Sequence, residues 1–95
     1  MKLFEPPFEF EWDTGNKDKN LQRHGVTNEE CEDIFFDPHK RILAEAVYLG
    51  EEKRFILVGR TKKGRGLFVV FTPRGNKIRI ISARLLNRKE RKFLR

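Results

Sequence analysis

Leu67-Phe68-Val69-Val70-Phe71 is the longest unbroken apolar run in the chain. Successive side chains of a strand point to opposite faces, so a strand apolar on both faces is expected at the centre of a sheet, covered on both sides. Further strands are expected over residues 42–48, 54–60 and 77–83, beside a central strand over 67–72. Gly50-Glu51, Lys63-Gly64 and Gly75-Asn76 mark short turns between them. Turns this short join antiparallel neighbours, which predicts a β-meander.

Helix signals stand on both sides of this meander. A short helix is expected from Asp13 or Thr14 through His24, ended by Gly25. Thr27 and Glu30 form a capping box, which opens a second helix to about residue 36. Asn87 and Glu90 repeat that spacing before a basic C-terminal helix. Together with an alternating strand over 8–12, these signals predict a small single α+β domain over residues 1–95, with two N-terminal helices, an antiparallel meander and a C-terminal helix.

The charges divide sharply along the chain. Residues 1–48 carry a net charge of −5, whereas residues 49–95 carry +12, which together give the formal +7. So large an asymmetry indicates a polyanion as the partner of the second half, with nucleic acid ahead of membrane phospholipid. A lone cysteine, Cys31, excludes an internal disulfide and any multi-cysteine zinc site. With neither a signal peptide nor an apolar spanning run, the sequence predicts a cytoplasmic protein that does not bind a membrane.

Four arginines on the predicted strands are the first candidates for phosphate contact. Arg54 and Arg60 share one strand face and stand roughly 20 Å apart, too far for one phosphate but suited to an RNA strand. Arg79 and Arg84 are five positions apart and face opposite ways unless a bulge intervenes. Structural roles are the alternative to phosphate contact, since Arg79 and Arg84 could instead bind the last strand to Glu11, Asp13 or Asp33.

Several short segments of the chain, at residues 10–13, 20–26, 35–38, 79–84 and 87–91, follow one another in a known order together with the Glu52-x-Arg54 pair. On these segments the chain resembles the BrnT family of bacterial ribonuclease toxins. The resemblance implies a RelE-like toxin fold, RNA cleavage without a metal or other cofactor, and a BrnA-like ribbon-helix-helix antitoxin through which the pair reaches operator DNA. Two departures are the glycine before Glu52-x-Arg54, one residue early at Gly50, and Phe71 where many members have tyrosine.

RNA can be cut by its own 2′-OH, so the protein must supply positioning, positive charge and proton transfer. Guanidiniums match phosphate oxygens, and imidazole ordinarily titrates near neutral pH. His24 is therefore a candidate acid or base, although it could simply bond the end of its helix. Glu52 could act as base or orient Arg54. The expected catalytic set is His24, Glu52, Arg54, Arg60, Arg79 and Arg84, and the expected RNA-binding set is Lys53, Arg74, Arg88 and Arg91.

Alternatives from other classes stay open. Asp37 with Glu51-Glu52-Lys53 loosely fits a metal-dependent nuclease, in which two carboxylates hold Mg²⁺. A non-catalytic nucleic-acid or partner-binding module would hold phosphate and leave RNA intact. Membrane binding through the basic C-terminal helix is weaker, because its apolar face is small.

Overall fold

The computed structural model describes residues 8–47 and 52–94, with the side chains of 44–47 left out. Tyr48 and the Gly50-Glu51 turn therefore lie outside the described residues, as does the altered glycine position. The sheet strands are β1 (Phe10–Glu11), β2 (Arg41–Val47), β3 (Lys53–Arg60), β4 (Gly66–Arg74) and β5 (Lys77–Leu85). The helical elements are α1 (Lys19–His24), α2 (Asn28–Asp33) and the 3₁₀ segments η1 (Ile34–Phe36) and η2 (Glu90–Leu94).

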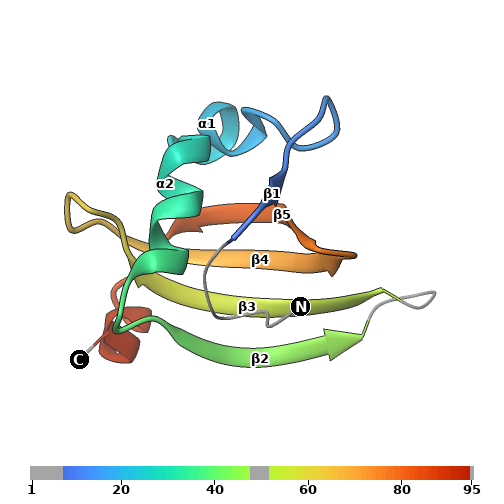
Figure 1. Cartoon of the computed structure of the whole chain (residues 1–95). Coiled ribbons are helices and arrows are strands. Elements are labelled where there is room, and N and C mark those ends of the chain that lie inside the picture. The colour runs from blue at the N-terminus through green and yellow to red at the C-terminus, as the bar shows by residue number, and fades with distance from the viewer. Residues whose placement is uncertain (1–7, 48–51, 95) are drawn as a thin grey trace.

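The five strands form one mixed sheet in the order β1-β5-β4-β3-β2 (Figure 1). β2 to β5 pair antiparallel in sequence order, which confirms the predicted meander, with β4 at its centre. The expectation of an all-antiparallel sheet is wrong, because β1 pairs parallel to β5. Parallel neighbours need a long connection, and here the helices and the strands β2 to β4 lie between β1 and β5 along the chain. Alternation in residues 8–12 predicted a strand, but neither its neighbour nor its direction.

A β-bulge interrupts β5. Val70 pairs with Ser82 whereas the next residue, Phe71, pairs with Ile80, so Ile81 is the extra residue. Burial follows the same shift, because Ile78 and Ile80 are buried and the next buried position is Ala83. A bulge exchanges the faces of all later side chains. Arg79 and Arg84, five positions apart, therefore lie on the same face of the sheet.

The main core lies between the sheet and the helices. α2 crosses one face of the sheet in Figure 1, and Phe35 just beyond it packs edge-on against Phe71, with ring centroids 5.0 Å apart. Phe71 also stacks on Phe55. Phe71 is fully buried in this layer, so its departure from tyrosine does not touch the opposite face. The prediction that both faces of β4 are buried is confirmed only in part, because Phe68 and Val70 on that opposite face are half-buried.

Cys31 belongs to the same core. It is fully buried, and burial raises the pKa of its thiol to about 12. The thiol therefore stays protonated, as expected of a residue that fills space.

Two asparagines continue the edge of the sheet beyond β1. Asn16 Nδ2 donates to the carbonyls of Glu11 (2.9 Å) and Ile80 (3.0 Å), and Asn20 Oδ1 accepts from the amide of Ala83 (2.9 Å). Both side chains are buried. They satisfy backbone groups of β5 that the two-residue β1 is too short to reach. This explains why Asn20 stands on a buried position of a short helix.

The helix limits differ from the predicted ones in two places. Residues 14–18 form turns in place of a helix, because Asn16 folds inward to bond the strands, and α1 begins only at Lys19. Gly25 ends α1 in the left-handed region at φ 68°, as predicted. The capping box of Thr27 and Glu30 is present at the start of α2. The C-terminal helix is a 3₁₀ turn, although Asn87 and Glu90 make the predicted reciprocal cap.

Candidate functional site

The face of the sheet opposite α2 is here called the open face. Cross-strand pairing assigns it alternate residues of each strand, since Phe55, Leu57 and Phe71 point into the core. Its members are Arg54, Ile56, Val58 and Arg60 from β3, Gly66, Phe68, Val70 and Thr72 from β4, and Arg79 and Arg84 from β5. All four strand arginines of the predicted catalytic set thus lie on one face, with apolar side chains between them.

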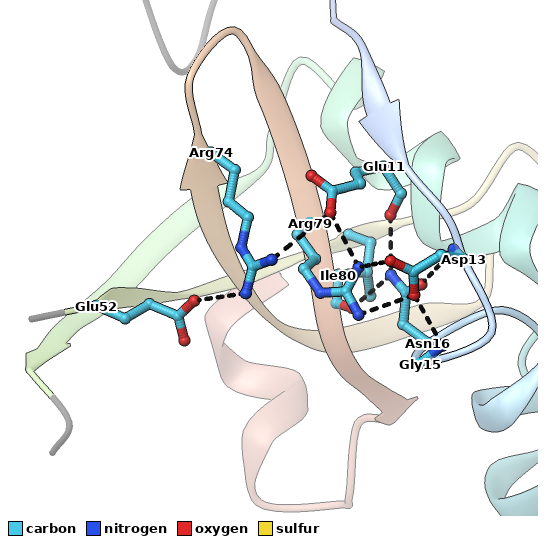
Figure 2. A network of polar contacts seen from close by, with 8 residues as sticks. All are labelled: Glu11, Asp13, Gly15, Asn16, Glu52, Arg74, Arg79 and Ile80. Carbon is cyan, nitrogen blue, oxygen red and sulfur yellow. Dashed lines mark hydrogen bonds and ion pairs between the residues drawn. The ribbon is translucent and has the colours of Figure 1, made fainter. Parts of the chain in front are cut away.

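One end of the open face holds a chain of alternating charges, here called the arginine–carboxylate network (Figure 2). Arg79 Nη1 donates to Asp13 Oδ2 (2.8 Å) and Glu11 Oε1 (3.1 Å), and Arg79 Nη2 donates to Asp13 Oδ1 (3.0 Å). Arg74 lies 3.7 Å from Glu11 and 3.1 Å from Glu52. Glu52 in turn accepts from Arg54 Nε at 3.1 Å. Each of these guanidiniums therefore already has a carboxylate partner.

The pKa values follow from these contacts. The hydrogen bond from Arg79 holds the pKa of Asp13 below its ordinary value, and the same bond raises the pKa of Arg79. Hydrogen bonds from Arg74 and then Arg54 lower the pKa of Glu52. Asp13, Glu52 and Arg79 are therefore charged at neutral pH, and Glu52 is present as the carboxylate.

Arg79 is the most enclosed guanidinium of the network. Its side chain is only 12% exposed, against 29% for Arg54. Its three bonds reach Glu11 at the end of β1 and Asp13 just beyond, so it fastens the acidic N-terminal segment to β5. The geometry supports the structural role weighed for Arg79 and leaves little of the guanidinium for a ligand.

Arg84 lies nearer the middle of the open face. Its guanidinium carbon is 4.1 Å from the centroid of the Phe68 ring, and its two Nη atoms donate to the two oxygens of Glu90 at 2.7 and 2.8 Å. The hydrogen bonds from Arg84 lower the pKa of Glu90 to about 2. This bidentate pair attaches η2 to the sheet. Arg41 adds a second attachment by donating to the carbonyl of Phe93 (3.3 Å).

The opposite end of the open face holds Arg60, the last residue of β3. Its backbone amide donates to Asp37 (2.8 Å), while its side chain is exposed. Nearby, Arg65 binds Glu30 through two bonds of 2.7 and 2.9 Å and donates to the carbonyl of Gly25 (3.3 Å). His24 is the last residue of α1 and directly precedes Gly25, so its backbone lies near Arg65 in the β3–β4 turn.

The structure therefore divides the predicted site residues between the two ends. Glu52, Arg54, Arg74 and Arg79 meet in the network with Lys53 beside them, whereas His24, Arg60 and Arg91 lie toward the other end. Arg88 is exposed in the turn before η2. Within residues 8–47 and 52–94, the structure shows no hydrogen bond or ion pair between His24 and a member of the network. Sequence reasoning named Glu11 and Asp13 only as structural partners and missed Asn16, whose spacing carried no signal.

The alternative metal site does not assemble around Asp37 and Glu52. Asp37 lies at the end of β3 and Glu52 precedes its start, a separation of roughly 25 Å for eight residues of strand. Glu51 lies outside the described residues. In the part of the chain that the structure describes, no three His, Cys, Asp or Glu side chains are grouped to hold an ion.

The fold and the open face define a small basic α+β domain with arginines spread along one side of a mixed sheet. The family model for BrnT, the ribonuclease toxin of type II toxin–antitoxin systems, matches residues 12–90. The chain belongs to this family, whose toxins act on RNA and are paired with an antitoxin. No curated protein matches the chain at a significant level. None of the described helices is long and apolar enough to cross a membrane.

Proposed function

We propose that this protein is a metal-independent endoribonuclease that cuts RNA by attack of a 2′-OH on the adjacent phosphate. The observation that carries the proposal is the bulge at Ile81, which places Arg84 on the same face as Arg54 and Arg60. A single face with guanidiniums at both ends and in the middle can follow a phosphate backbone. Guanidiniums also stabilise the negative charge that develops on the phosphorane.

Glu52 and Arg54 are the pair proposed for the chemistry. They contact each other at 3.1 Å, and both side chains are about 30% exposed, so an RNA phosphate can approach them. The lowered pKa of Glu52 keeps it as the carboxylate, which can accept the proton of the 2′-OH. His24 is the second candidate for proton transfer. Arg79 positions the network through Glu11 and Asp13.

The proposed partner is a ribbon-helix-helix antitoxin that covers the open face. The exposed arginines and half-buried apolar side chains of this face suit a partner segment that is acidic and amphipathic. Operator DNA would be bound by the antitoxin's own domain.

The test is incubation of the purified chain with single-stranded RNA in excess EDTA, with analysis of the fragment ends. We expect fragments that end in 2′,3′-cyclic phosphate, and no cleavage where the attacking ribose is 2′-deoxy. Cleavage that EDTA abolishes would overturn the metal-free mechanism. Loss of cleavage in His24→Gln but not in Glu52→Gln would move the proton transfer to the other end of the face.

A further inference from the structure

A cleft lies between the β3–β4 turn and η2, at the Arg60 end of the open face. Its volume is about 340 Å³, and arginines and leucines share its lining. Arg60, Arg65 and Arg91 supply the charge, and Leu86 and Leu94 supply an apolar wall. Figure 1 shows why these residues meet, because the β3–β4 turn and η2 lie at the same end of the sheet.

The floor of the cleft depends on a glycine. A Cβ at Gly66 would lie 2.9 Å from Leu94 Cδ1 and 3.0 Å from Leu86 Cδ1. Both distances are shorter than ordinary van der Waals contact, so the two leucine side chains could not keep these positions over a residue that has a Cβ. The two leucines are thereby held directly over β4. The wall continues along the same face of β4 to Phe68, which carries the stacked Arg84.

The charges in the cleft are balanced only in part. Arg65 is neutralised by Glu30, which binds it through both oxygens. The side chains of Arg60 and Arg91 form no ion pair with a carboxylate among residues 8–47 and 52–94. Two cations that converge on one concave surface repel each other, and an anion between them removes that repulsion. Phosphate suits such a place, because a guanidinium binds two of its oxygens in parallel.

We infer that this cleft is a nucleotide subsite that binds one phosphate of the RNA between Arg60 and Arg91 and its base against Leu86 and Leu94. The volume lies at the small end of the range for ligand pockets, which suits a single nucleotide. Arg60 stands roughly 20 Å along β3 from Arg54, so the subsite positions the RNA at a distance from the bond that is cut. The inference rests on the proposed function, because that function makes RNA the source of the bound nucleotide.

Binding is tested without cleavage, with adenosine 5′-monophosphate as the probe and backbone amide resonances as the reporter. We expect shifts centred on Gly64 and Gly66, and affinity about tenfold lower in Arg91→Gln. Lys17→Gln is the matched control, because it removes one positive charge from an exposed side chain elsewhere. Equal affinity in Arg91→Gln and the control, or shifts centred on Glu11 and Arg79, would overturn the subsite.

Cleavage kinetics then separate the two proposals. If the subsite positions RNA, Arg91→Gln should raise KM about tenfold and leave kcat nearly unchanged. The slope of log affinity for RNA against log salt concentration should also become shallower by about one unit, which is the share of one phosphate contact. A chain that binds the nucleotide in the cleft but never cuts RNA would refute the proposed function alone. RNA cleavage with unchanged KM in Arg91→Gln would refute the subsite alone.

Discussion

The two ends of the open face treat their arginines in opposite ways. At the network end, Arg79, Arg74 and Arg54 alternate with Asp13, Glu11 and Glu52, so each cation touches a carboxylate. At the cleft end, Arg60 and Arg91 face a cavity, and no described carboxylate pairs with either side chain. The count of arginines is therefore a poor measure of phosphate binding. The carboxylates of the rest of the chain reduce the positive charge that the network arginines can offer to an anion.

The same comparison assigns the two ends different energetic roles. Ion pairs that link distant parts of the chain contribute to stability, whereas unpaired exposed cations contribute little to it and remain available to a ligand. Substitutions at Arg79 and the residues that hold it should therefore act mainly on unfolding, and those at Arg60 and Arg91 on binding.

The largest loss of stability is expected from Asn16→Ala, because Asn16 holds the segment that carries Glu11 and Asp13 against β5. Asn16 is 3% exposed, bonds Glu11 and Ile80, and accepts from the amide of Asp13 (2.8 Å). Its removal leaves buried backbone groups without partners and should lower the free energy of unfolding by about 2–3 kcal/mol. Chemical denaturation measures this. Asn76→Ala, at an exposed turn, is the control, and equal losses in the two variants would show that the asparagine bridge is not needed.

A smaller effect separates the two ends directly. Arg79→Ala should lower the thermal midpoint by about 5 °C, because Glu11 and Asp13 lose their shared cation. Arg60→Ala should leave the midpoint within about 1 °C, since its exposed side chain forms no ion pair with any described carboxylate and its backbone contacts survive the substitution. Paired thermal melts check this. If both variants melt alike, the contrast between a structural end and a binding end is wrong.

The smallest effect concerns acid and the attachment of η2. The pKa of Glu90 is lowered to about 2 in the folded chain, so the stability from its pair with Arg84 is complete above the ordinary value of 4.5. It is lost as the pH falls from 4.5 toward 2. Because Arg84 is 38% exposed, we expect a loss of only about 1 kcal/mol. Chemical denaturation as a function of pH should show this loss of unfolding free energy in the native chain and a smaller loss in Arg84→Gln.

Local signals in the sequence predicted most of the elements correctly. The run at residues 67–71 indicated the central strand, and the turns at Gly64 and Gly75 indicated the antiparallel neighbours of β4. The cap residues Thr27 and Asn87 also act where their spacing predicted. These features involve residues a few positions apart, so their geometry is set by local backbone preferences and short hydrogen bonds.

The candidate site was predicted less completely, for identifiable reasons. Alternation alone puts Arg79 and Arg84 on opposite faces, and a one-residue bulge at Ile81 reverses that result. Nothing in the spacing of Asn16 predicts that it meets β5, and Asp13 was only one of three carboxylates weighed as partners of Arg79 and Arg84, because these contacts span more than sixty residues. His24 and Glu52 were grouped in one expected catalytic set, yet the fold places them toward different ends of the face.

By itself, the sequence determined the α+β composition, the order of the meander strands, the helix caps and the excess of basic residues in the second half. The tertiary structure alone decided that β1 pairs parallel to β5, that four arginines share one face, and which of them are neutralised. The physical reason is the range of the interactions. Backbone preferences and capping bonds act within a few residues, whereas a guanidinium takes its partner from whichever carboxylate the completed sheet brings within 3 Å.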